Sequence, residues 1–164
     1  MRRLIVLLFA TLVGLAMMTG VAQAKPVTLT FHEHQVESTF TDVIPCIGNG
    51  QELGTITTVE NGVLHITAAA LDENGDPIPP YHITGTFTGT VTAVPQDPSL
   101  PTFTGHFATW FGENSNQITF NDTDTFTVIL AGSDGSTLKF HDTFHVTVNA
   151  NGEVTVEFDK PSCF

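Results

Sequence analysis

Side chains alternate between two kinds along most of the chain, and this alternation constrains the fold more than any other feature. In the stretch 81–92, Thr and His fill the even positions, and apolar residues or Gly fill the odd positions. A repeat of two places successive side chains on opposite faces of a β-strand, one of them buried. The division recurs from Thr28 to Phe158, with all 7 histidines on the Thr-bearing face. The pattern predicts β-strands throughout.

Residues typical of turns interrupt the alternation at regular intervals. These turn signals lie at 45–50, 61–62, 74–80, 95–101, 112–116, 133–136 and 149–152. Between them lie about eight segments rich in Thr, Val, Ile and Phe, which is the composition of strands. No stretch shows helical periodicity, and no linker divides the chain. We therefore expect a single all-β domain.

Two-residue and three-residue turns predict how neighbouring strands align. Asn61-Gly62 is the signal for a two-residue hairpin, which would pair Val59 with Leu64. At 133–135, a three-residue loop with Gly135 in the left-handed conformation keeps the apolar residues on one face. That loop aligns Leu130 with Leu138 and Val128 with Phe140.

The same reasoning applied to the loop 150–152 predicts the last hairpin. It aligns Val148 with Val154, Val146 with Val156 and Phe144 with Phe158. It also places His145 opposite Glu157.

Phenylalanine dominates the apolar face. The rings with apolar parity are Phe31, Phe87, Phe103, Phe107, Phe111, Phe120, Phe126, Phe140, Phe144 and Phe158. Gly85, Gly89 and Gly105 share that face, and alternating large and small residues suit the curved wall of a small barrel. We expect one antiparallel barrel of about eight strands, with a two-sheet sandwich as the alternative. The residues expected to line a ligand cavity are Phe87, Phe103, Phe107, Phe126, Phe140 and Phe144.

Residues 1–24 have the features of a secretory signal peptide. Arg2 and Arg3 precede an apolar stretch, and Ala22-Gln23-Ala24 is an A-x-A cleavage signal. The apolar stretch, about 15 residues long, is shorter than the roughly 20 that span a bilayer, although an uncleaved anchor is the alternative. We expect a secreted mature domain of residues 25–164.

The mature domain is strongly acidic. It retains Lys25, Lys139 and Lys160 and no arginine, against 17 carboxylates, so its formal charge is 3 − 17 = −14. Phosphate backbones and anionic lipids both attract clustered Lys and Arg. The charge therefore excludes nucleic acid and acidic membranes as partners, and leaves the oligomeric state open.

Cys46 and Cys163 are the 2 cysteines of the chain. In an exported protein they predict a disulfide that encloses most of the mature domain. A redox-active or metal-binding thiol pair is the alternative, but the long separation lacks a C-x-x-C motif.

Two histidine patterns are candidates for chemistry. His32 and His34 project to one side of a strand, a spacing that metal sites use, with two exposed histidines as the alternative. His106, His145 and Glu157 share the Thr-bearing face, where a His–carboxylate pair could act as a general base. A modest surface contact is the alternative for that pair. No nucleophile elbow, phosphate-binding loop or zinc-protease motif is present, so we expect no cofactor.

Several short strings resemble a group of small secreted proteins of actinobacteria whose activity is uncharacterised. They are TGHF at 104–107, WFGEN at 110–114, GSDGS at 132–136, FH at 140–141 and FDKPSC at 158–163. The resemblance implies export and a β fold and lends no catalytic residues. In outline, a small acidic Phe-lined barrel is also similar to allene-oxide-cyclase-like and lipocalin-like barrels, a similarity of fold that does not carry function.

Three functions are compatible with these features. The first is binding of a small apolar ligand in a Phe-lined interior. The second is a cyclase- or isomerase-type enzyme that uses His106, His145 and Glu157 at the barrel mouth. The third is an extracellular interaction module that acts through the Thr/His face, with histidine titration making binding depend on pH.

Overall fold

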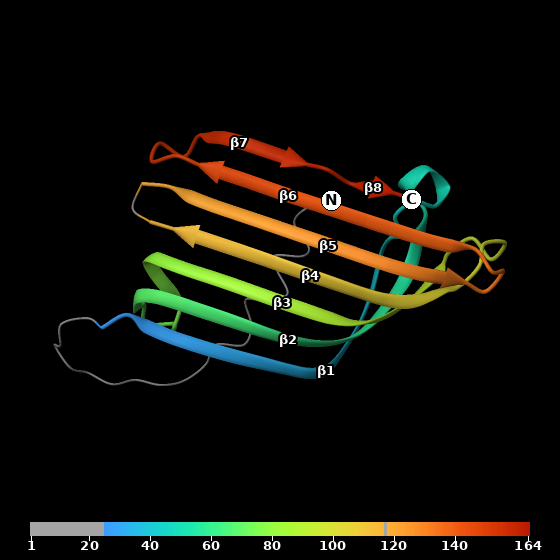
Figure 1. Cartoon of the computed structure of the whole chain (residues 1–164), viewed down its shortest axis with the longest axis horizontal. Coiled ribbons are helices and arrows are strands. Elements are labelled where there is room, and N and C mark those ends of the chain that lie inside the picture. The colour runs from blue at the N-terminus through green and yellow to red at the C-terminus, as the bar shows by residue number, and fades with distance from the viewer. Residues whose placement is uncertain (1–24, 117) are drawn as a thin grey trace.

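The computed structural model describes residues 25–116 and 118–164, so the predicted signal peptide lies outside the described residues. These residues form one antiparallel sheet in which β1 to β7 lie side by side in sequence order and β8 pairs with β6 (Figure 1). The strands are β1 Val27–Val43, β2 Leu53–Leu71, β3 Pro77–Pro95, β4 Phe103–Ser115, β5 Phe120–Gly132, β6 Thr137–Val148, β7 Val154–Asp159 and β8 Ser162–Cys163. The all-β prediction is confirmed.

A short 3-10 helix, η2 (Gly48–Gly50), lies in the connection between β1 and β2. Within the described ranges, no helix has the length and apolar character needed to cross a membrane.

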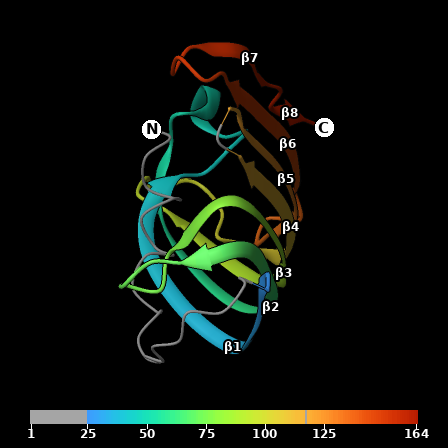
Figure 2. The ribbon, with the colours of Figure 1, turned by 90° about the vertical axis from the view of Figure 1, so that its left-hand side faces the viewer.

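The sheet is bent into an open trough and is not closed into a barrel. Seen end-on in Figure 2, the strands curve from β1 on one side to β6 and β7 on the other. Among the described strands, β1 pairs only with β2, and β7 pairs only with β6. β1 has 17 residues and β7 has 6, so β7 offers too short an edge to satisfy the backbone of β1. The expected barrel closure is therefore not observed, and no second sheet is present in these ranges to make a sandwich.

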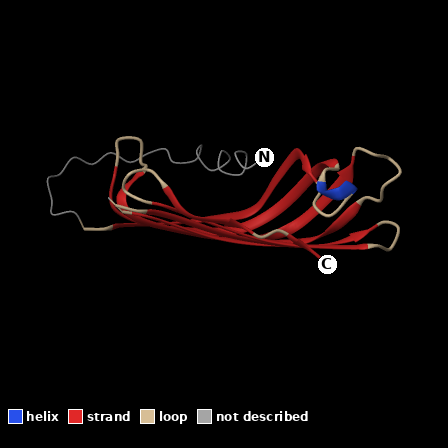
Figure 3. Cartoon of the chain, turned by 90° about the horizontal axis from the view of Figure 1, so that it is seen from above, coloured by secondary structure: helices blue, strands red, loops and turns tan. Residues whose placement is uncertain are grey.

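The connection between β1 and β2 covers one end of the trough. It crosses the concave face to reach β8, as Figures 1 and 3 show. Ile44, which is 1% exposed, packs there in a hydrophobic cluster with side chains from β3, β4, β5 and β6. The buried members of this cluster are Ile44, Val91, Ala93, Phe103, Phe107, Val128, Leu130 and Leu138.

The predicted disulfide between Cys46 and Cys163 is present and joins this connection to β8. It links the two sides of the trough, which no strand pairing among the described residues does. We call the end of the trough that residues 44–52 cover the covered half of the concave face.

Asn61-Gly62 does not form a turn, so the predicted hairpin at this position is wrong. β2 continues through both residues, which pair with Thr88 and Phe87 of β3. Contacts with residues distant in the sequence explain why Asn and Gly occupy these two positions. The Asn61 side chain accepts hydrogen bonds from the backbone N–H and the side-chain amide of Gln35, at 3.1 and 3.3 Å. Gln35 lies at a β-bulge in β1 with a φ of 53°.

Gly62 is required because a phenylalanine ring covers it. A Cβ at Gly62 would lie 2.0 Å from the ring of Phe87 on the neighbouring strand. Gly85 stands in the same relation to Phe111, at 2.2 Å. The expected alternation of Phe and Gly on one face is thus a set of cross-strand pairs in which the ring lies over the glycine.

The register of the hairpin between β5 and β6 is confirmed. Leu130 pairs with Leu138 and Val128 with Phe140, across a three-residue loop in which Gly135 has a φ of 86°.

The register predicted for β7 is wrong beyond its first pair. Val148 does pair with Val154, but a bulge follows, and Thr147 then pairs with Val156. Because side chains alternate with a period of two, one extra residue moves the rest of β7 to the opposite face. Phe158 therefore pairs with His145, on the Thr-bearing side, instead of with Phe144.

Candidate functional site

The convex face carries the threonines and histidines, as the alternation predicted. Cross-strand pairs place His82 beside Thr67 and His106 beside Thr90. The rings are held by neighbouring hydroxyls: Thr123 lies 2.7 Å from Nδ1 of His145, and Thr127 lies 2.9 Å from Nδ1 of His141. The threonines thus fix the orientation of the histidine rings on this surface.

The proposed acid–base group of His106, His145 and Glu157 is not brought together. His145 lies opposite Phe158, with the ring centroids 5.4 Å apart, and Glu157 lies opposite Val146 on the other face. His145 pairs with Thr123 of β5, which pairs in turn with Gly112 of β4. Gly112 lies six residues from His106 along β4. At about 3.3 Å per residue this separates the two histidines by about 20 Å along the sheet. The expected His145–Glu157 pair is therefore wrong.

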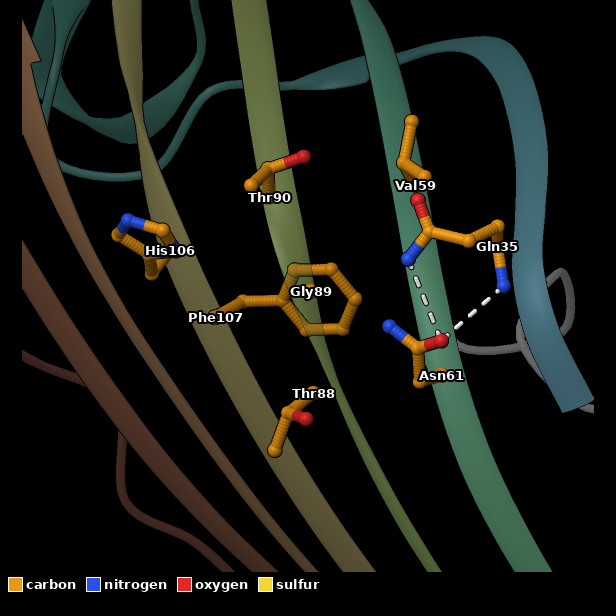
Figure 4. Close-up of a pocket in the computed structure, with 8 residues that line it drawn as sticks. All are labelled: Gln35, Val59, Asn61, Thr88, Gly89, Thr90, His106 and Phe107. Atoms are coloured by element: carbon orange, nitrogen blue, oxygen red, sulfur yellow. Dashed lines mark hydrogen bonds between the residues drawn. The ribbon is translucent and has the colours of Figure 1, made fainter.

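His106 instead lines a shallow pocket of about 310 Å³ near the bulge of β1 (Figure 4). The lining residues are Gln35, Val59, Asn61, Thr88, Gly89, Thr90, His106 and Phe107. The pocket is wide open to solvent and holds one histidine and no carboxylate. It therefore offers hydrogen-bonding groups but no acid–base pair.

His32 and His34 lie on β1, the edge strand of the sheet, and both are exposed. Over residues 25–116 and 118–164 no group of three or more His, Cys, Asp or Glu side chains is arranged to hold a metal ion. The structure thus supplies no third ligand to the predicted metal pair.

The six phenylalanines predicted to line a cavity all lie on the concave face, but they divide between its two halves. Phe103 and Phe107 are buried in the covered half, and Phe126 and Phe140 pack against them. The rings of Phe107, Phe126 and Phe140 follow one another across the sheet with centroids 6.2 Å apart. This half is a packed core.

The rest of the concave face is only partly covered, and we call it the open half. Phe87 is buried there, stacked on Phe111 with the ring centroids 6.1 Å apart. Phe111 itself is partly exposed, and so are other large apolar side chains of this half: Leu29, Phe31, Leu64, Phe144 and Val146. The open half is thus an apolar surface that the described part of the chain leaves accessible.

Carboxylates occupy several positions of this otherwise apolar face. Glu113 of β4 lies directly opposite Asp122 of β5, and Asp124 follows two residues later on the same side. Asp124 lies opposite Phe111 and Phe144, and Asp142 of β6 lies opposite Phe126. We call Glu113, Asp122, Asp124 and Asp142 the acidic row. Like charges directly opposite one another on a sheet are destabilising, so strand pairing does not account for them.

Burial and repulsion by neighbouring carboxylates shift the pKa of two members of this row, Asp124 and Asp122. Desolvation raises the pKa of Asp124 to about 6, with further contributions from Asp122, Glu113 and Asp142. Desolvation, followed by the charge of Glu113, raises the pKa of Asp122. Tyr81 donates a hydrogen bond from its hydroxyl to Oε1 of Glu113, and burial followed by this bond raises the pKa of Tyr81 to about 12.

One oxygen of the acidic row has no partner. Oδ1 of Asp142 is buried and makes no hydrogen bond in the structure. Buried polar atoms are nearly always hydrogen-bonded, because an unpaired one costs about 1–3 kcal/mol. The open half therefore combines partly exposed aromatic rings, clustered negative charge and an unsatisfied acceptor.

The sequence does contain a signal for the acidic row. In the segment 120–126, Asp122 and Asp124 have the same parity as Phe120 and Phe126, so carboxylates occupy positions that elsewhere hold apolar side chains. The candidates predicted from the sequence were the histidines of the opposite face, and these carboxylates were not among them. The partners Tyr81, Glu113 and Asp142 come from other strands and required the sheet register.

No protein-family model, no curated protein and no solved structure matches this chain. Function is therefore inferred from the residues of the trough itself.

Proposed function

We propose that this chain is a secreted, disulfide-stabilised sheet protein that binds a small apolar molecule on the open half of its concave face. The carrying observation is that large apolar side chains of this half, among them Phe111 and Phe144, remain partly exposed, whereas the covered half holds the buried cluster around Ile44. Contiguous exposed apolar surface in a soluble protein marks a place where something binds. The disulfide accords with the oxidising environment outside the cell.

The trough has the features that such a site needs. Its wall is rigid, because each strand is hydrogen-bonded to its neighbours and the covered half is a packed core. Aromatic rings such as Phe111 and Phe144 offer broad contact area and little conformational freedom to lose on binding. The ligand would lie in an open groove, in contrast to the enclosed cavity expected of a barrel.

The proposal is tested with a neutral aromatic probe, 1-naphthylmethanol, whose binding is followed by its fluorescence. Phe144→Ala removes a ring from the open half and is expected to weaken binding about tenfold, within the range that a lost buried aromatic contact causes. Trp110→Ala is the matched control, because Trp110 is 43% exposed and pairs with Thr86 on the convex face. Equal weakening by both substitutions, or no binding by the wild-type protein, contradicts the proposal.

A further inference from the structure

We propose that the ligand of the open half is an apolar cation, an amine attached to an aromatic or alkyl group, whose charge lies against the acidic row. This inference rests on the proposed function and names the chemical class of its ligand. It follows from where the charges of the chain lie on the sheet.

Negative charge gathers on the concave face. Besides the acidic row, Glu33 and Glu60 lie on this face near β1, and Glu157 pairs with Val146 near β7. Desolvation followed by the charge of Glu33 raises the pKa of Glu60, as expected of a carboxylate in apolar surroundings. The trough is thus acidic at both its sides and along its floor.

The three lysines of the mature chain lie elsewhere. Lys139 pairs with Ile129 on the convex face, and Nζ of Lys160 lies 4.8 Å from the centroid of the Phe158 ring. Lys25 precedes β1 and is exposed. Within residues 25–116 and 118–164, no lysine lies against the acidic row, which favours a bound molecule as the source of a cation there.

The acidic row is arranged to bind a ligand that carries its positive charge at one end. Asp124 lies between the strands that carry Phe111 and Phe144, so a positive group at its carboxylate would also face two aromatic rings. Rings attract cations through their negatively polarised faces, and carboxylates supply charge-assisted hydrogen bonds to an ammonium. Oδ1 of Asp142, buried and unpaired, would accept one of those bonds.

The same charges disfavour a second copy of this chain as the occupant. Two concave faces brought together would oppose one acidic row to another, in molecules of −14 formal charge each. An anionic amphiphile, such as a fatty acid, is disfavoured for the same reason. Charge complementarity thus selects a cation from the apolar ligands that the Phe surface could hold.

Three probes of one shape test the inference by calorimetry: 1-naphthylmethylammonium, the neutral 1-naphthylmethanol and the anionic 1-naphthoate. We expect the ammonium to bind the wild-type protein about tenfold more tightly than the alcohol, which corresponds to about 1.4 kcal/mol. The naphthoate is expected to bind more weakly than either. Added salt should reduce the difference between ammonium and alcohol, because it screens charge.

Two double variants with the same change in net charge locate the effect. Asp122→Asn with Asp124→Asn should remove the preference for the ammonium, so that the ammonium and the alcohol bind this variant with about equal affinity. Glu37→Gln with Glu73→Gln removes two exposed carboxylates outside the trough and should change neither affinity by more than about twofold. Glu113→Gln serves as a second variant of the acidic row, and circular dichroism checks that each variant is folded.

The outcomes separate this inference from the proposed function. If the alcohol and the ammonium bind equally well, or if the Glu37/Glu73 variant loses the preference as fully as the Asp122/Asp124 variant, the acidic row does not select a cation, while the apolar site stands. If none of the three probes binds the wild-type protein, the proposed function itself is wrong.

Discussion

Replacing Asp124 by Asn should stabilise the protein at neutral pH, because the native fold holds this carboxylate in unfavourable surroundings. Asp124 lies on the concave face beside Asp122, and both Glu113 and Asp142 are close enough to act on it. Desolvation and these charges raise its pKa from 3.8 to about 6. Asparagine has nearly the same shape and carries no charge at any pH.

The size and sign of the effect follow from proton linkage. A difference of about 2 pKa units corresponds to about 3 kcal/mol for a fully buried group. Asp124 is partly exposed, so solvent screening reduces this to about 1 kcal/mol. Because the folded-state pKa is raised, the folded protein binds the proton more tightly, and wild-type stability falls as pH rises from about 4 to about 6. The Asp124→Asn variant does not lose stability in this way, because asparagine stays neutral.

Urea unfolding followed by circular dichroism measures the effect at pH 7.5 and at pH 4. The expected result is that Asp124→Asn is about 1 kcal/mol more stable than wild type at pH 7.5 and gains little at pH 4. Asp134→Asn is the control of opposite sign. Hydrogen bonds from the side chain and backbone of Ser136 lower the pKa of Asp134, so its loss should destabilise the protein at pH 7.5.

A loss of stability on Asp124→Asn at pH 7.5, or a gain that is the same at both pH values, would refute this reasoning. The first result would mean that the charge of Asp124 is compensated in the native fold, and the second that the gain comes from the amide itself and not from removal of the charge. The expected result would mean that stability is given up to keep a carboxylate on an apolar surface, as is common at binding sites.

Three further predictions concern the fold and the site. Replacing Cys46 and Cys163 together by Ser should lower the free energy of unfolding by about 4–5 kcal/mol, since the bridge spans 117 residues; a loss below about 1 kcal/mol in urea would contradict this. Gly62→Ala should cost about 1–3 kcal/mol by forcing Phe87 aside, and should cost less in a Phe87→Leu background; equal costs would show that the ring is not the obstacle. Tyr81 is the single tyrosine, so its ultraviolet titration, with circular dichroism confirming the fold, should have a midpoint of about 12 that Glu113→Gln lowers. A wild-type midpoint near the ordinary value of 10 would contradict the Tyr81–Glu113 hydrogen bond.

The sequence predicted what local periodicity controls. The period of two predicted the strands, the apolar face and the opposite face that carries the threonines and histidines, whereas the hydrogen bonds between them come from the structure. The hairpin after Leu130 was predictable because a loop with a left-handed Gly135 leaves one register that keeps both strands' apolar residues together. The disulfide was predictable because the chain has two cysteines and its sequence predicts export, so that each cysteine has the other as its partner.

The failures share a physical cause, which is that contacts between distant residues override local signals. Asn61-Gly62 has the composition of a turn, yet Asn61 binds the bulge at Gln35 and Gly62 makes room for Phe87. The bulge in β7 could not be read from alternation, and it moved Phe158 and Glu157 to faces opposite to those expected.

Barrel closure and the acidic row also depend on how the strands are arranged in space, which the alternation of side chains alone does not determine. An open sheet and a barrel have the same alternation, and only the short β7 and the crossing of residues 44–52 distinguish them. The acidic row assembles across β4, β5 and β6, so its carboxylates are neighbours only once the register is known.

The most direct test of the central claim is to map the bound cation by NMR on the 15N- and 13C-labelled mature chain. On titration with 1-naphthylmethylammonium, we predict shift changes centred on Asp122, Asp124, Phe111 and Phe144. Contacts from the probe's ring protons to the phenylalanine rings should accompany them. Shift changes centred on the convex pocket around His106 and Thr90, or spread evenly over the exposed carboxylates, would contradict the claim that the concave face is the binding site.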